Sequence, residues 1–276
     1  MSVTYHLQAL TGVSEKPWAN HSAGAAQILK SRGHTGPQDE FESKLLLSLR
    51  GPVIVEGLIS PRVCLSQQEW QDLVLNAGDG DSIDGQMMRN MARLPNLLNR
   101  GRDALQLPQS SESEVMHILN EVEALKEASQ PVLDAFRERI QDHRQSTSCE
   151  HTPGLHRFWR VMHAHYARSF ALQLAVDIIL NSSLTALGSV KVDLAMESSK
   201  MSEEIVQLAE EVKEYRPLGA LYMVICLTLA WLGAGNEESK SQILDLLLEH
   251  QKDTNGATSS VSASGLDWIE KRFMLK

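Results

Sequence analysis

The sequence has few cysteines, and none of them lies near another. The three are Cys64, Cys149 and Cys226, and no CxxC pair occurs. A structural zinc site or a disulfide framework needs thiols at close, regular spacings, so we expect neither. Such isolated thiols suit a reducing compartment, and we expect the protein to be intracellular, in the nucleus or the cytoplasm.

Clusters of positive charge are also lacking. The chain has 26 Lys and Arg against 35 Asp and Glu, which gives a formal net charge of -9. No run of basic residues interleaved with aromatic ones offsets this excess. Such a protein repels phosphate backbones as a whole, so we expect no direct binding to nucleic acid.

The common catalytic signatures are absent: the chain has no GxSxG, no P-loop, no GxGxxG after a strand and no HExxH. This excludes the usual hydrolases, NTPases, dinucleotide enzymes and zinc proteases. The stretch DGDSIDG, Asp79–Gly85, is rich in carboxylates, but its third aspartate is displaced by one and Asn90 stands where an EF-hand needs glutamate. We therefore predict a solvated loop there, no metal and no cofactor.

Long apolar segments are scarce. The N-terminus has neither the basic start nor the apolar core of a secretory signal. The most apolar run, Leu218–Gly235, is about as long as a short membrane span. It contains Tyr222, Thr228 and Trp231 and is closely followed by charged residues, so we predict a buried core helix and no membrane.

Helical periodicity runs through most of the chain, and no stretch alternates as a strand does. We predict one all-α domain over residues 1–276, with several helices around a central apolar helix and no significant sheet. Ser66 and Glu69 have the spacing of a capping box, which predicts a helix start just after Ser66. Polar, low-complexity composition predicts flexible loops at 145–154 and 252–264.

Glycine and proline predict interruptions inside three of these helices. The block Phe41–Ile59 is expected to break at Gly51–Pro52, and the helix that follows Gln86 is expected to be interrupted near Pro95. The segment 114–144 is expected to form a long charged helix or a pair of helices, which Pro131 bends or splits.

The order of the helical blocks resembles a known family. WANHSAGAAQILKSRG, LLLSLRG with IVEGLIS, and CLSQQEW are similar to the middle of the fungal-specific transcription factor domain, which follows a Zn2Cys6 DNA-binding module. MSEEIVQLAEEVKEYRPLGALYMVICLTLAWLGA and GLDWIEKRF resemble its later helices and closing segment. The resemblance extends from about Tyr5 to the end. The six-cysteine cluster and its basic flank have no counterpart, so the resemblance implies an N-terminally shortened regulatory domain that does not read DNA itself.

The densest group of reactive side chains is HRFWRVMHAHY, from His156 to Tyr166. Its aromatic and imidazole rings could line a pocket in which His163 or Tyr166 exchanges a proton near neutral pH. His163 and His165 point about 200° apart on a helix, so they cannot chelate one metal. A half-buried helix with hydrogen-bonded histidines explains the same pattern.

The apolar helix Leu218–Trp231 places Tyr222 and Cys226 four residues apart on one side, which continues toward Trp231. This side of the helix could line a cavity for an apolar ligand, and the Tyr222 hydroxyl could orient that ligand. Core packing explains the helix equally simply.

Two functions agree with these features. The first is a stand-alone, regulator-like helical module that binds a hydrophobic small molecule or a regulatory protein. The second is a cofactor-free fungal biosynthetic enzyme, a cyclase or isomerase such as a pericyclase acting on a terpenoid or polyketide, which gains rate from orientation and hydrogen-bond donors. A shortened regulator without retained activity is a third alternative.

The candidate site residues serve both functions. The enzyme needs His163, Tyr166 and Tyr222 as catalytic groups that point into one cavity. The residues expected to contact the ligand are Trp159, His156, Cys226 and Trp231. The charged helices between Glu114 and Arg144 offer a surface for a homodimer, although their charged faces suit water equally well.

Overall fold

The computed structural model describes residues 15–32, 38–59, 63, 65–75, 82–106, 112–146, 153–220, 222–255 and 273. Within this part of the chain every regular element is a helix. The α-helices are α2 (Glu15–Arg32), α3 (Glu40–Ile59), α4 (Gln67–Leu75), α5 (Ile83–Gln106), α6 (Glu112–Ser146), α7 (Pro153–Ala186), α8 (Leu194–Glu211), α9 (Met223–Gly233) and α10 (Glu237–Asn255), and the 3₁₀ turns are η1 (Val212–Tyr215) and η2 (Leu218–Ala220). The predicted all-α class is confirmed.

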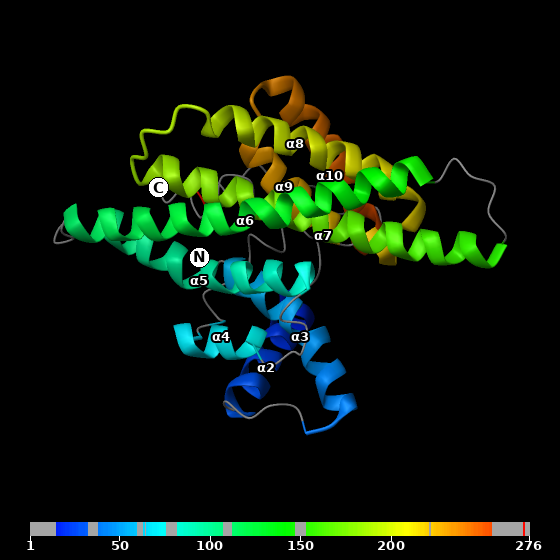
Figure 1. Cartoon of the computed structure of the whole chain (residues 1–276), viewed down its shortest axis with the longest axis horizontal. Coiled ribbons are helices and arrows are strands. Elements are labelled where there is room, and N and C mark those ends of the chain that lie inside the picture. The colour runs from blue at the N-terminus through cyan, green and yellow to red at the C-terminus, as the bar shows by residue number, and fades with distance from the viewer. Residues whose placement is uncertain are drawn as a thin grey trace.

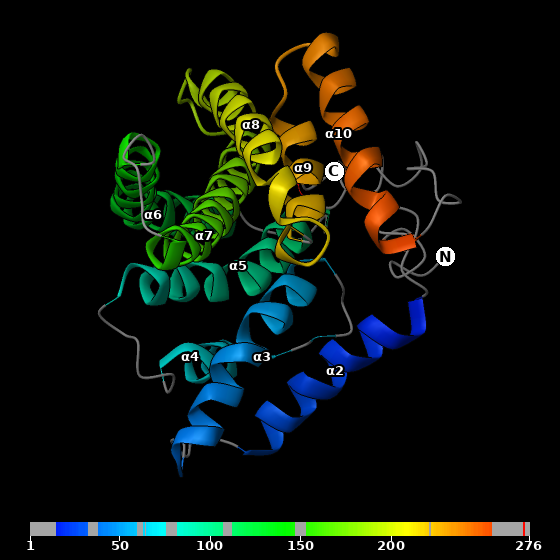
Figure 2. The same ribbon diagram turned by 90° about the vertical axis from the view of Figure 1, so that its right-hand side faces the viewer.

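Three long helices, α6, α7 and α8, form the centre of the molecule. They run along the long axis in Figure 1 and are seen end-on in Figure 2, with α7 packed between α6 and α8. Helix α5 packs against α6 and α7 and joins them to α3 and α4, while α9 and α10 cover the side near α8. Helix α2 packs on α3 at the edge of the molecule.

The second half of helix α7 is deeply enclosed. Among the described residues, Arg157–Ala186 is the one helical segment long and apolar enough to cross a membrane, and 83% of its apolar window is buried inside the protein. The surrounding helices α6, α8 and α9 supply that cover. Apolar residues all around a helix are expected when neighbouring helices enclose it.

Helices α3, α5 and α6 run unbroken through Pro52, Pro95 and Pro131, so the predicted breaks in α3 and α5 and the predicted split of α6 are wrong. A proline removes one backbone hydrogen bond and crowds the preceding turn, at a cost of about 3 kcal/mol or more. These helices have 20, 24 and 35 residues and bury apolar side chains on both sides of the proline. The burial of many side chains outweighs one defect.

The apolar run Leu218–Gly235 is not one helix. It begins with the short turn η2, and the α-helix α9 has only 11 residues. Pro217 and Gly219 disfavour a regular helix at the start of the run. Helix α9 nevertheless lies in the core, against α7, α8 and α10, as the prediction of a central apolar helix requires.

The sequence pattern at the start of α4 predicted the structure better than the prolines inside the helices did. The predicted capping box is present: the Ser66 backbone N–H donates to the Glu69 carboxylate at 2.7 Å, and the Glu69 N–H donates to Ser66 Oγ at 3.2 Å. Of the predicted loop 145–154, residues 145–146 belong to α6 and residues 153–154 to α7, and 147–152 lie outside the described residues. Residues 252–255 of the other predicted loop belong to α10, and 256–264 lie outside the described residues.

Candidate functional site

The first half of α7 meets the end of α6 in a cluster of aromatic and imidazole rings. His143 of α6 is 5% exposed and lies at its centre. Its ring contacts Trp159 edge-on at 4.5 Å between centroids, Tyr166 at 5.3 Å and His163 at 6.0 Å. We call these four residues the aromatic–imidazole cluster. Burial and the neighbouring His163 lower the pKa of His143, which favours its neutral form.

A chain of polar contacts leads from this cluster to α8. The Tyr215 hydroxyl lies 2.8 Å from His163 Nδ1, and His163 Nε2 lies 3.7 Å from Glu211 Oε2. Arg144 holds the same carboxylate, at 3.2 Å from Nε and 2.8 Å from Nη2. Elements separated in sequence, α6, α7, α8 and η1, therefore place an imidazole between a hydroxyl and a carboxylate.

The protonation states in this chain follow from its surroundings. Burial, and then the negative charge of Glu214, raise the pKa of Tyr215, so its hydroxyl keeps its proton. Burial opposes ionisation of Glu211, but His163 and Arg144 outweigh it and lower the pKa of that carboxyl. His163 therefore has a hydroxyl within hydrogen-bond distance of Nδ1 and a carboxylate near Nε2.

Arginines surround the cluster on its outer side. Arg139 lies over the Tyr166 ring at 5.5 Å, and Arg160 lies over the Tyr215 ring at 5.7 Å while pairing with Glu214 at 3.1 Å. On α7 itself a set of side chains faces solvent, which we call the outer face of α7: Arg157, Phe158, Arg160, Val161 and Arg168. Phe158 and Val161 are 59% and 61% exposed.

Of the predicted site residues, the structure brings Trp159, His163 and Tyr166 together. Tyr222 lies within electrostatic reach of Tyr215, Cys226 and Arg168, and burial raises its pKa. Its hydroxyl is buried without a hydrogen-bond partner among the described residues.

Two of the other predicted ligand contacts, Cys226 and Trp231, belong to α9. Cys226 is fully buried in α9, and this burial raises the pKa of its thiol and keeps it protonated. Trp231 lies near the end of α9, where Lys240 Nζ sits 5.1 Å from its ring centroid. The side chain of His156 lies outside the described residues.

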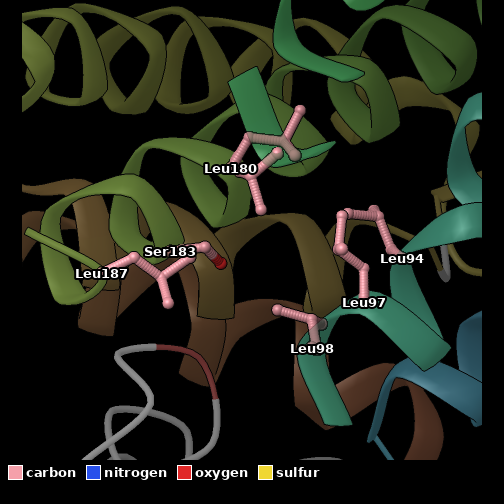
Figure 3. A pocket seen from close by; sticks show the side chains of 7 residues that line it. Leu94, Leu97, Leu98, Leu180, Ser183 and Leu187 are labelled. Atoms are coloured by element: carbon pink, nitrogen blue, oxygen red, sulfur yellow. The ribbon is translucent and has the colours of Figure 1, made fainter. Parts of the chain in front are cut away.

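A small hollow lies away from this cluster, at the junction of α5, α6 and α7. Figure 3 shows leucines of α5 facing Leu180 and Ser183 of α7 and Leu187, which directly follows that helix. The hollow has no internal volume that would hold a water molecule, and none of the predicted site residues lines it. The Ser183 hydroxyl donates to the Ile179 carbonyl of its own helix at 2.9 Å. This hollow is a packing seam between helices.

Of the Asp79–Gly85 stretch, the structure describes residues 82–85. The predicted solvated loop is wrong for residues 83–85, because they form the start of α5. Ser82 Oγ accepts the Gly85 N–H at 2.9 Å, which caps the start of α5. Asp84 accepts a hydrogen bond from Ser169 at 2.8 Å and contacts His165 at 3.3 Å. In the described part of the chain, no group of three or more His, Cys, Asp or Glu side chains could hold a metal ion.

Sequence inspection missed His143, Glu211 and Tyr215. Tyr215 lies 52 residues from its partner His163, so no local spacing connects them. The nearest sequence signal for Tyr215 was the YRPLG stretch, which begins at this residue, the last one of η1. That stretch was used only as part of the family resemblance. Comparison of the chain with protein-family models, curated proteins and solved structures gave no match.

Proposed function

We propose that the chain is a regulator-like helical interaction module that binds a partner protein and has no DNA-binding activity of its own. The outer face of α7 is where the partner docks. The observation that carries this proposal is the combination of two exposed apolar side chains, Phe158 and Val161, with three exposed arginines on one helix segment. Aromatic residues and arginine are enriched at the energetically important positions of protein interfaces.

Charge supports one class of partner. Residues 153–176 contain no Asp or Glu, although the chain as a whole carries a formal net charge of -9. An acidic partner is repelled by most of the protein surface and attracted to this segment. Arginine also pairs with carboxylates through two parallel hydrogen bonds. We therefore assign the face to an acidic protein segment that carries apolar side chains.

The cluster beneath the face supports a pre-ordered binding surface. Phe158 stands at 75° to Trp159 with ring centroids 6.5 Å apart, and Trp159 packs on the buried His143. Arg160 is held by Glu214 and by the Tyr215 ring. Side chains already fixed before binding lose less conformational entropy on association, so a modest face can still bind specifically.

Site-specific photo-crosslinking tests this proposal. A photoreactive phenylalanine analogue at position 158 is expected to capture one acidic, apolar segment in cells, whereas the same analogue at Phe41 captures none. Phe41, on α3, is 75% exposed and is the matched control. The captured segment, made as a peptide, should bind the wild-type protein and lose at least tenfold in affinity with Phe158→Ser or Arg160→Glu.

Three outcomes contradict the proposal: equal capture from both positions, a captured segment without acidic residues, or a peptide whose affinity neither substitution changes. Capture of lipid or nucleic acid from position 158 assigns the face to a different class of partner. A peptide affinity that falls as salt is raised is expected, because charge pairs contribute to the complex.

A second candidate is the cofactor-free enzyme, and the contact of His163 with Tyr215 and Glu211 favours it. Such a trio can move a proton to or from a bound substrate. A cyclase or isomerase gives a product of unchanged mass, so a metabolite extract incubated with the protein should lose one compound and gain an isobaric one. His163→Gln should abolish this change. An extract that the wild-type protein leaves unaltered removes support for this candidate.

A further inference from the structure

A layer of buried polar side chains lies where α6, α7 and α8 meet. Asp177 of α7 is 1% exposed, and its Oδ2 accepts hydrogen bonds from Gln173 Nε2 at 2.6 Å and Ser129 Oγ of α6 at 3.2 Å. Gln173 and Ser129 are fully buried as well. A carboxyl group is rarely placed so deep in a helical core without a cation bound to it, and here both of these hydrogen-bond donors are neutral.

The next turn of α7 connects this carboxyl to α8. Lys126 of α6 bonds both Asn181, one turn after Asp177, and Glu197 in the first turn of α8. Asn181 Nδ2 donates to Ser198 Oγ at 3.1 Å and to the Leu194 carbonyl at 3.3 Å. Lys126 and Asn181 therefore connect the start of α8 to α6 and α7 by polar contacts, beside the packing of buried Leu194.

The charged groups around Asp177 have opposite effects on the ionisation of its carboxyl group. Lys126 of α6 favours the ionised carboxyl, and Glu197 of α8 disfavours it. Arg137 of α6 also interacts with Asp177, although its guanidinium is paired with Glu204 of α8. Helix α9 supplies no Asp, Glu, Lys, Arg or His. On α5, the charged Asp84 is engaged by His165 and Ser169, two turns away along α7.

We propose that Asp177 is a pH-operated latch for α8: when the carboxyl is protonated the three helices stay closed, and when it ionises it competes for Lys126 and loosens the start of α8. The competition is with the ion pair to Glu197, which is the charged link between α6 and the first turn of α8. Loosening is confined to the part of α8 before Glu204, because Arg137 and Arg144 bind Glu204 and Glu211 farther along the helix.

The pH range follows from burial. Burial raises the pKa of Asp177 from 3.8 to about 6, against the hydrogen bonds from Gln173 and Ser129 that lower it. A carboxyl whose pKa is higher in the closed state binds its proton more tightly there, so the closed state is favoured at low pH and loses stability as the pH rises toward 6. Most carboxylates in folded proteins have a lowered pKa, so their contribution to stability increases with pH instead. The latch stands on different contacts from the outer face of α7 and does not depend on that proposal.

Hydrogen exchange of the full chain, corrected for intrinsic exchange rates, tests the latch. Between pH 5 and pH 8 the protection of residues 194–202 should fall by about tenfold in the wild-type protein. Asp177→Asn should keep protection constant within about twofold, since the amide has no proton to lose. Asp134→Asn, an exposed carboxylate on α6, is the matched control and should behave as the wild type.

Ser129→Ala provides the second test, in case Asp177→Asn alters folding. It removes a hydrogen bond to the ionised carboxyl, so the transition should move to higher pH. Wild-type protection that does not depend on pH overturns the latch, as does full pH dependence in Asp177→Asn. A loss of protection that is equal in all helices also overturns it, because it indicates global unfolding instead of a local opening.

Discussion

The two halves of α7 differ sharply in their surroundings. From Arg157 to Tyr166 every side chain is half-buried or exposed, whereas from Ala167 to Leu184 all but Arg168, Leu172 and Ser182 are buried. The first half meets α6 and the turn η1, while the second half is enclosed by α6, α8 and α9. One continuous helix thus joins a segment whose side chains are half-buried or exposed to a segment that forms part of the core.

The composition of each half matches its surroundings. The exposed half carries arginines, histidines and aromatic rings, which tolerate water and bind other groups through charge, hydrogen bonds and ring contacts. The enclosed half is mostly apolar, with Phe170 among aliphatic residues, and its buried polar side chains include the layer of Gln173, Asp177 and Asn181. Substitutions in the second half should therefore cost stability, and those in the first should chiefly affect binding.

The largest expected effect is at Phe170, in the enclosed half. Phe170 is 1% exposed, so Phe170→Ala leaves a cavity and should lower the free energy of unfolding by about 3 to 5 kcal/mol. Urea denaturation followed by circular dichroism measures this. A loss below about 1 kcal/mol would show that the helices around α7 collapse easily into the space.

The next effect is at Gly233, where α9 approaches α8. An added Cβ would lie 2.7 Å from Ser202 Oγ, 3.0 Å from the Ser198 carbonyl and 3.2 Å from Ile178 Cγ2 of α7. Ser202 Oγ cannot move freely, since it donates to the carbonyls of Ser198 and Ala230, each at 2.8 Å. Gly233→Ala should cost about 1 to 3 kcal/mol.

Gly24 provides the control for Gly233. A Cβ there meets nothing within 4 Å, so Gly24→Ala in α2 should leave stability unchanged or raise it by up to about 1 kcal/mol through helix propensity. Equal unfolding free energies for the two variants would contradict the close packing of α8 and α9.

A smaller effect is expected at Tyr215, at the border of the exposed half. Tyr215→Phe removes the hydroxyl that contacts His163 and should cost about 1 kcal/mol. Tyr222→Phe is the matched control, because its buried hydroxyl has no hydrogen-bond partner among the described residues, and its removal should be neutral or stabilising. Urea denaturation at pH 8 compares them. The reverse order of stability would show that Tyr222, and not Tyr215, makes the structural hydrogen bond.

The helical class and the ring-rich segment could be predicted from local sequence, whereas the geometry of the site could not. Helical periodicity and the Ser66–Glu69 capping box depend only on residues that are close together in the sequence. The unbroken helix through Pro131 depends on tertiary packing, which no local pattern contains. Trp159, His163 and Tyr166 were found because they crowd one helix, but their partners His143 and Tyr215 come from α6 and η1 through the packing of helices distant in sequence.

The smallest expected effect is at Phe158, which is chemically identical to Phe170 and lies on the same helix. Phe158 is 59% exposed, so Phe158→Ala removes little buried surface and should change the free energy of unfolding by no more than about 0.5 kcal/mol. Urea denaturation of both phenylalanine variants under the same conditions gives the comparison directly. A loss above about 1 kcal/mol would mean that Phe158 supports the aromatic–imidazole cluster through Trp159, and any binding defect of the variant would then report on folding. A stable variant instead makes Phe158 a clean probe of the proposed docking, because a loss of binding in that variant could not be explained by a loss of folding.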